Sequence, residues 1–288
     1  MYPATDMDNL RFISLGLGQQ STALYLMSSL GQLPTADYAV FADTGSETKE
    51  TYAYLKWLLN WQKEHNGIPI IRTGRKKSLY HDLIKGTNSH GTRFASIPAF
   101  TKNPDGSTGM LRRQCTEEYK ITQIQQTIRN VYGLKRYQRA PQTEIWLGIT
   151  IDEMERMKFP RHKWQVHVYP FCDYKAVHNR SERLGGFPVL RRADCTHWLR
   201  EQGFPVPPKS ACFFCPYQSN ARWLNMKKNQ PNEWKRAVKL DQQIRDSSRK
   251  GVEQPIYLHQ TCVPLDEVNL NENQLDLFPG ECDGLCGV

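Results

Sequence analysis

The first 74 residues alternate between short apolar runs and amphipathic segments, and this alternation constrains the fold more than any other feature of the chain. The apolar runs at 12–15, 36–45 and 68–74 have the length and composition of buried strands. The segments between them, 20–30 and 46–66, carry apolar residues at helical spacing. A strand–helix–strand order of this kind predicts parallel strands joined by right-handed crossovers. We therefore expect an α/β fold, doubly wound, with a mainly parallel sheet.

The remaining chain shows weaker patterning, and we expect it to add to a single α/β domain. The further expected elements are a loop or lid at 86–110, helices at 117–133, 195–202 and 219–247, a buried strand at 143–151 and an irregular charged stretch at 152–192. These patterns divide the chain into three parts. They are an α/β part at 1–160, a cysteine-bearing helical segment at 161–255 that completes the same domain, and a polar tail at 256–288.

Length and charge limit the class of protein. The 288 residues are enough for one large α/β domain. The formal net charge of +9 favours a polyanionic partner such as a nucleotide or nucleic acid, with a solvated basic surface as the alternative. No apolar run approaches the roughly 18 residues of a membrane span, and the N-terminus lacks the basic and apolar regions of a secretory signal. We expect a cytoplasmic protein with no membrane partner.

A glycine turn, formed by Gly16 and Gly18, joins the first apolar run to the first amphipathic segment. Glycine has no β-carbon, so the backbone can turn sharply and approach a ligand closely. The helix that follows offers unpaired N–H groups to a phosphate, and Ser21 and Thr22 add hydroxyl donors. The spacing matches neither G-x-x-x-x-G-K-[ST] nor G-x-G-x-x-G, so plain packing of strand against helix is the alternative interpretation.

Asp43, Thr44 and Gly45 end the second expected strand and form a second candidate group. Ligands of parallel α/β sheets bind outside the carboxyl ends of the strands. An acidic side chain at that edge can hydrogen-bond a ribose or an adenine amino group, or hold Mg²⁺, although Asp43 can equally be a helix cap. Two consecutive strand–turn–helix units with polar ends favour a nucleotide site.

These two stretches, FISLGLGQQSTALYLM (12–27) and VFADTGSETKETYAYL (40–55), resemble the adenine nucleotide alpha hydrolase superfamily, the PP-loop ATP pyrophosphatases. The most similar branch is the phosphoadenosine phosphosulfate (PAPS) reductase-like proteins, in which the loop after the first strand holds phosphates. The D-T-G-x-x-x-x-E-T-Y stretch of that branch is matched by Asp43, Thr44, Gly45, Glu50, Thr51 and Tyr52. Its usual S-G-G-K-D-S loop reads Gly16-Leu17-Gly18-Gln19-Gln20-Ser21 here. Glutamines replace the lysine and the aspartate, so the resemblance implies nucleotide binding more directly than ATP hydrolysis.

Three further stretches extend the resemblance to roughly residues 11–225. RRQCTEEYKI (112–121) is similar to the R-x-C-T-x-x-Y-K-I element of the branch. LGITIDEMERM (147–157) and the cysteine-bearing stretch at 192–223 are similar to its uncharacterised, often phage-borne, members. The resemblance implies a nucleotide site formed by Gly16, Gly18, Gln20, Ser21, Thr22, Asp43, Thr44, Gly45, Arg112 and Lys120. Asp152 follows a strand end and is a candidate to contact substrate or Mg²⁺, a helix start being the alternative.

The eight cysteines suggest metal or redox chemistry, because disulfide frameworks are rare in cytosolic proteins. Cys212 and Cys215 form a C-x-x-C turn, which can ligate a metal, form a redox pair or simply be buried. Cys115 lies among arginines that favour its thiolate. We expect Cys115, Cys195, Cys212 and Cys215 to bind one metal centre. The resemblance favours a [4Fe-4S] cluster there, and zinc is the alternative.

The chain ends in GECDGLCGV, and Cys282 and Cys286 loosely resemble the C-terminal cysteine with which PAPS reductases attack a sulfonucleotide. A disordered or metal-clasping tail is the alternative. The function implied by the resemblance is adenylation of an acceptor by ATP, followed by sulfur transfer, with nucleic acid as a candidate acceptor. The alternatives are sulfonucleotide reduction and a non-catalytic nucleotide- or nucleic-acid-binding module. The sulfur donor and the oligomeric state, a homodimer included, are left open.

Overall fold

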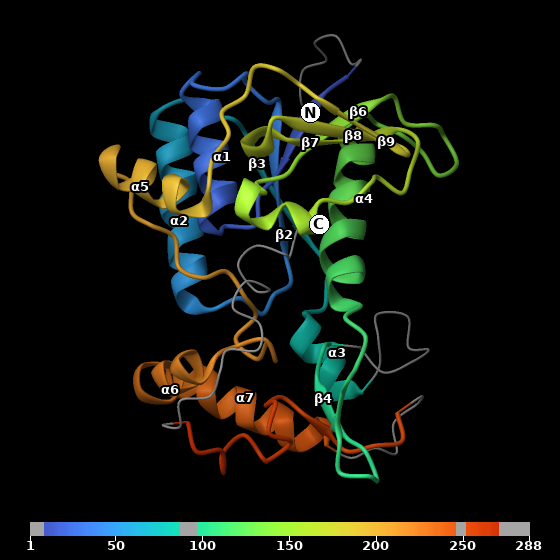
Figure 1. Ribbon diagram of the computed structural model, residues 1–288, viewed down its shortest axis with the longest axis vertical. Helices are drawn as coiled ribbons and strands as arrows, with labels where there is room; N and C mark the ends of the chain where they lie inside the picture. Colours follow the sequence, from blue (N-terminus) through green and yellow to red (C-terminus); the bar gives the residue numbers. More distant parts are fainter. Residues whose placement is uncertain (1–8, 87–96, 246–251, 271–288) are drawn as a thin grey trace.

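The computed structural model describes residues 9–86, 97–245 and 252–270, and its centre is a seven-stranded sheet (Figure 1). The strand order is β3-β2-β1-β6-β7-β8-β9. The strands are β1 (Arg11–Ser14), β2 (Tyr38–Asp43), β3 (Ile70–Gly74), β6 (Thr143–Trp146), β7 (Gln165–Tyr169), β8 (Tyr174–Val177) and β9 (Arg180–Arg183). The first five in this order pair in parallel, and β8 and β9 add an antiparallel edge. The expected α/β fold with a mainly parallel sheet is confirmed.

Helices cover both faces of this sheet. On one face lie α1 (Gln19–Ser29), α2 (Lys49–Glu64) and α5 (Arg192–Glu201), and on the other lie the π-helix η1 (Glu117–Ile121) and α4 (Thr122–Val131). Alternate strand residues point to opposite faces, so Ile13 joins the core under α1 while Phe12 joins the core under α4. From β1 the chain adds β2 and β3 on one side, and from β6 it adds β7 on the other side. The strand order therefore reverses between β1 and β6, and their carboxyl ends form the topological switch point of the sheet.

A smaller second layer lies beyond the carboxyl end of β2, in the lower half of Figure 1. It contains α3 (Leu79–Lys85), α6 (Asn220–Asn229), α7 (Pro231–Ile244) and a three-stranded antiparallel sheet of β10 (Ile256–Tyr257), β4 (Phe100–Lys102) and β5 (Thr108–Met110). Leu83, Trp223 and Leu240 belong to its own fully buried core. The remaining short helices are η2 (Ile151–Arg156) and η3 (Pro170–Cys172).

Three elements differ from the sequence expectation. The stretch at 152–192 was expected to be irregular, but it contains β7, β8 and β9. The four residues of β9 are all exposed, so its sequence has no apolar pattern that predicts a strand. The single helix expected at 219–247 is two helices, since Pro231 has no backbone N–H to continue α6 and instead starts α7. The loop expected at 86–110 includes β4 and β5, and residues 87–96 lie outside the described part.

Part of the segment expected to be a polar tail packs against α7. Asp241 on α7 is fully buried, and its carboxylate accepts hydrogen bonds from the backbone N–H of Leu258 at 2.8 Å and of Leu265 at 3.0 Å. Strand β10 also pairs with β4. Residues 252–270 are thereby joined to the second layer, and the rest of the expected tail, 271–288, lies outside the described residues.

Candidate functional site

The glycine turn lies between β1 and α1, at the carboxyl edge of the sheet. Gly18 is the N-cap of α1, and its N–H donates to the Ser21 hydroxyl at 3.3 Å. Leu17, between the two glycines, has a φ of +57° and is fully buried. A left-handed backbone is costly for leucine, so the surrounding core must hold this turn in place. The turn therefore presents a fixed helix start to the sheet edge, while Thr22 is buried inside α1.

Gly148, which follows β6, makes the closest approach to this helix start. A β-carbon at Gly148 would lie 2.8 Å from the backbone nitrogen of Ser21 and 2.9 Å from its α-carbon. Only glycine fits at that separation, so the end of β6 contacts the first turn of α1 directly. Gly148 stands within the LGITIDEMERM stretch (147–157), and no site role was predicted for it. A glycine immediately after a buried strand is the signal that points to it.

Gln19 and Gln20, at the start of α1, bind protein groups. The side-chain oxygen of Gln19 accepts from Arg192 Nε at 3.2 Å and from the Thr196 hydroxyl at 3.0 Å. The buried Gln20 donates from Nε2 to Glu153 Oε2 at 2.7 Å. These contacts dock α5 and η2 onto the helix start. Because residues 16–22 include no lysine or arginine, Arg192 supplies a positive charge beside this turn.

Asp152 and Glu153, at the start of η2, also bind protein groups. The Asp152 carboxylate accepts from the backbone N–H of Arg192 at 3.1 and 3.2 Å. Glu153 forms a buried ion pair with Arg156 at 2.5 Å, and burial raises the pKa of its carboxyl group. The role predicted for Asp152 in substrate or Mg²⁺ binding stays a prediction, and in the structure its carboxylate fixes the start of α5.

Asp43, predicted to bind the nucleoside or Mg²⁺, is saturated with hydrogen bonds. Its Oδ1 accepts from Gly45 N at 2.7 Å and from the Tyr52 hydroxyl at 2.8 Å. Its Oδ2 accepts from Arg72 Nε at 3.0 Å and from Arg72 Nη2 at 2.5 Å. A carboxylate has about four lone-pair positions, so these four bonds fill it. In this arrangement Asp43 organises the turn after β2, and its role as a ligand stays a prediction.

Thr44, Glu47, Lys120 and Cys212 form a buried polar group next to that turn. Glu47 Oε1 accepts from the Thr44 hydroxyl at 3.2 Å and from Lys120 Nζ at 3.3 Å. The Thr44 hydroxyl lies 3.3 Å from Cys212 Sγ. Lys120, predicted to form part of the nucleotide site, forms a buried ion pair with Glu47. It is carried by the π-helix η1, a rare helix type that is frequent at functional sites. Arg112 is exposed in the segment before η1.

The four predicted metal ligands are not brought together. Cys115 and Cys212 pack against the core of the second layer, and Cys215 lies in the C-x-x-C turn beside Ala211 and Tyr217. Cys195 belongs to the other core, where α5 covers α1, and burial strongly raises the pKa of its thiol. Across residues 9–86, 97–245 and 252–270, no group of three or more His, Cys, Asp or Glu side chains is placed to hold a metal ion. The set does not fit one metal centre in this arrangement, and the cluster stays a prediction.

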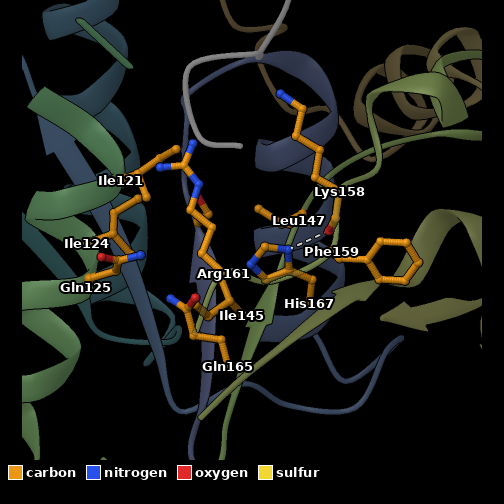
Figure 2. Close-up of a pocket in the computed structure, with 11 residues that line it drawn as sticks. Ile121, Ile124, Gln125, Ile145, Leu147, Lys158, Phe159, Arg161, Gln165 and His167 are labelled. Carbon is orange, nitrogen blue, oxygen red and sulfur yellow. Dashed lines mark hydrogen bonds between the residues drawn. The ribbon is translucent and has the colours of Figure 1, made fainter. Parts of the chain in front are cut away.

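A cavity of about 80 Å³ opens at the switch point, between α4 and the strands β1, β6 and β7 (Figure 2). Its walls are the apolar side chains Ile121, Ile124, Ile145 and Leu147, its polar groups are Ser14, Gln125, Gln165 and His167, and its rim carries Lys158, Phe159 and Arg161. Sequence analysis predicted none of these residues as ligands. They come from four separate stretches and share no motif, so only the folded chain identifies them.

His167 gives this cavity a hydrogen-bond acceptor. Its Nδ1 lies 2.9 Å from the carbonyl oxygen of Lys158, and a carbonyl can only accept, so Nδ1 carries the proton (Figure 2). Burial lowers the pKa of His167 and keeps the ring neutral. Nε2 therefore has a lone pair. On the rim, Arg161 pairs with Glu117 at 2.8 Å.

The cavity and the glycine turn are neighbours along two strands. Ser14 lines the cavity and is the last residue of β1, directly before the turn. Leu147 lines the cavity, and the next residue, Gly148, contacts the first turn of α1. A ligand at the switch point can therefore place one end in the cavity and the other at the start of α1.

Cys282 and Cys286, predicted as catalytic, lie outside the described residues. No helix in the described part of the chain has the length and apolar character needed to cross a membrane. Comparison with models of known protein families gives no match, and comparison with curated proteins gives none either.

Proposed function

We propose that this chain binds an adenine nucleotide at the switch point and uses ATP to adenylate an acceptor for sulfur transfer, like the PAPS reductase-like ATP pyrophosphatases that its motifs resemble. The observation that carries the proposal is the meeting of the cavity and the glycine turn between β1 and β6. Ligands of open α/β sheets bind at this position. The motif order at 11–225 supports the choice of an adenine nucleotide.

The cavity suits the edge of a planar base. Ile124, Ile145 and Leu147 offer apolar contact to the faces of a ring, while the amides of Gln125 and Gln165 offer donors and acceptors to its edge. The neutral His167 can accept from an exocyclic amino group through Nε2. A volume of about 80 Å³ admits the inner edge of a base, so the sugar would remain outside.

The start of α1 suits the phosphates. The unpaired N–H groups of a first helical turn carry a partial positive charge, and this turn is fixed by Gly18 and Gly148. Arg192 adds a full charge from the start of α5. We expect these groups to orient the triphosphate and to neutralise charge on the leaving pyrophosphate.

In the proposed reaction an acceptor oxygen attacks the α-phosphorus of ATP and the bond to pyrophosphate breaks. Hydrosulfide from a sulfide donor then attacks the adenylated carbon, a C–S bond forms as the C–O bond breaks, and AMP leaves with the acceptor oxygen. The chain's own residues bind and orient the nucleotide in both steps. No step is assigned to a metal centre, because Cys195 lies in a different core from Cys115 and Cys212.

A non-catalytic nucleotide-binding module is the second candidate, and one observation favours it. The Gln19 amide oxygen accepts from Arg192 and Thr196, and the Gln20 amide donates to Glu153, so the two side chains that replace the charged residues of the family loop hold protein groups. Tight ATP binding without pyrophosphate release from any acceptor supports this second candidate over the enzyme.

The test is calorimetric titration of the full chain with ATP, GTP and AMP, together with a pyrophosphate-release assay. Gln125→Ala removes an amide from the cavity, and Gln126→Ala, one residue along α4 and exposed, is the matched control. Loss of one hydrogen bond costs about 0.5–1.5 kcal/mol, so Gln125→Ala is expected to weaken ATP binding about 2- to 10-fold. The control is expected to bind as the wild type does.

Two outcomes would contradict the proposal. One is the absence of ATP binding at millimolar concentration, and the other is an equal effect of both substitutions. Release of sulfite from an activated sulfate, in place of pyrophosphate from ATP, would assign the chain to sulfonucleotide reduction instead.

A further inference from the structure

A second pocket, of about 540 Å³, lies at the carboxyl ends of β2 and β3, on the far side of β2 from the switch point. We call it the β2–β3 pocket. Its lining residues are Asp43, Gly45, Arg72, Thr73, Gly74, Arg75, Lys76 and Ser78. Asp43 and Gly45 also belong to the nucleotide site that the resemblance implies, but the site proposed at the switch point does not use this pocket.

The floor of the β2–β3 pocket is bare backbone. A β-carbon at Gly74 would lie 2.4 Å from the carbonyl oxygen of Asp43, so the two strand ends meet too closely for any other residue. Gly45 has a φ of +67°, and a β-carbon there would lie 2.7 Å from that of Ser78. Both positions therefore require glycine, and at these two positions the chain contributes only backbone atoms to the pocket wall.

The charge of the pocket is positive. Asp43 is its one carboxylate, and Arg72 together with Gly45 and Tyr52 already neutralises and saturates it. Arg75 and Lys76 form no ion pair within the described ranges, and Lys76 is exposed. Among the residues that the structure describes, the side chains of Arg75 and Lys76 therefore add two positive charges that no ion pair offsets.

Aromatic rings hold the two arginines of the pocket. The guanidinium carbon of Arg72 lies 5.7 Å from the ring centre of Tyr52, and that of Arg75 lies 5.7 Å from the ring centre of Tyr119. Tyr119 is itself fixed by a 2.5 Å hydrogen bond to Asp82. Guanidinium groups held in this way lose less entropy when they bind an anion, and their planar donors match the oxygens of a phosphate.

We propose that the β2–β3 pocket binds backbone phosphates of a nucleic acid strand. The inference rests on the proposed function only in naming that strand as the acceptor. The pocket is displaced from the switch point by two strand spacings, about 10 Å, so it is a separate anion site beside the start of α1. The net charge of +9 is the sign that a polyanion requires. The phosphates of the bound nucleotide are the alternative ligand of this pocket, and the experiment distinguishes them from the backbone phosphates of a strand.

The experiment compares Arg75→Gln/Lys76→Gln with a matched control, Lys56→Gln/Lys63→Gln, which removes two charges from the exposed face of α2. Binding of a fluorescein-labelled 20-nucleotide single strand is measured by anisotropy from 0.05 to 0.5 M salt, and ATP binding by calorimetry. Each phosphate contact to a single strand contributes about 0.7 to the slope of log K against log salt. The pocket variant is expected to lose about 1.4 of that slope, which is about 25-fold in affinity at 0.1 M salt. Its ATP affinity is expected to stay unchanged.

Four results would overturn the inference. They are failure of the wild type to bind the strand, equal losses in both variants, an unchanged salt slope in the pocket variant, and a loss of ATP affinity with strand binding retained. The last result would show that the pocket binds the phosphates of ATP and not those of a nucleic acid strand. If the wild type binds the strand but not ATP, the proposed function fails while the pocket assignment stands.

Discussion

The α-carbon of Gly148 lies so close to Ser21 that a β-carbon added to it would be 2.8 Å from the Ser21 backbone nitrogen. This contact joins the end of β6 to the first turn of α1 and fixes the helix start at the switch point. Gly148→Ala must therefore displace the turn. We expect a loss of about 1–3 kcal/mol in the free energy of unfolding, the range for overpacking, measured by urea denaturation. ATP affinity should fall as well, because the phosphate-binding turn moves.

The matched control is Gly186→Ala, since a β-carbon at Gly186 would meet nothing within 4 Å. We expect this variant to unfold and to bind ATP as the wild type does. Wild-type stability in Gly148→Ala would show that the turn tolerates a side chain at position 148. The contact between Gly148 and Ser21 would then not fix the start of α1.

Arg192 is expected to provide the cation that the glycine turn lacks. Its Nε is 3.2 Å from Gln19, so a lysine at position 19 would place a charge in the same region. Arg192→Gln removes a charge-assisted bond worth about 1.5–3 kcal/mol, which corresponds to roughly 10- to 150-fold weaker ATP binding. Gln19→Lys in the same chain should restore part of that affinity, and calorimetry measures both variants. Equal ATP affinity in the wild type and Arg192→Gln would place the phosphates elsewhere.

The fold could be predicted from the sequence where a short segment contains its own hydrophobic pattern. The runs that became β1, β2 and β3 are apolar and bounded by turn residues, and periodicity is enough to find them. It failed at β9, whose exposed residues pair with β8 through backbone hydrogen bonds that leave no trace in hydropathy.

The candidate site was predicted less well, because side-chain partners are not local. Asp43 ends the expected strand, but its saturation by Arg72, 29 positions away, requires the β2–β3 register. Cys195 has a thiol that could ligate a metal, but α5 directs this side chain into an apolar core. The cavity draws on η1, α4 and three strands, so no single stretch of sequence contains its pattern.

The buried pair of Glu47 and Lys120 gives a prediction about stability. Their side chains are 0% and 6% exposed, so replacing the Glu47 carboxylate takes its counter-charge away from a buried ammonium group. Glu47→Gln is expected to cost about 3–5 kcal/mol in the free energy of unfolding. Adding Lys120→Met should recover most of that loss, because an apolar replacement removes both desolvated charges. Urea denaturation measures both, and additive losses in the double variant would contradict a direct coupling.

Cys195 tests the four-cysteine metal centre. In the structure it is a fully buried core residue under α1, so Cys195→Ala should lower the free energy of unfolding by about 1–2 kcal/mol through the cavity it leaves. Iron and zinc bound per chain, measured by mass spectrometry after purification without oxygen, should not change. Loss of metal from this variant, with metal retained after Cys172→Ala in the other buried core, would instead assign Cys195 as a ligand.

His259 predicts how stability depends on pH. It is 1% exposed, its Nε2 lies 2.8 Å from Asn220 Oδ1, and its Nδ1 lies 2.8 Å from the Thr261 hydroxyl. Burial lowers the pKa of His259 from 6.5 to about 4. Between pH 6.5 and pH 4 the histidine is therefore protonated in the unfolded chain and neutral in the folded chain. Stability from this group is complete above pH 6.5 and is lost as the pH falls towards 4, by up to about 1.4 kcal/mol per pH unit. His259→Gln should flatten that part of the curve of unfolding free energy against pH, measured by urea denaturation from pH 7.5 to 4.5. An equally steep curve in the variant would assign the acid sensitivity to other groups.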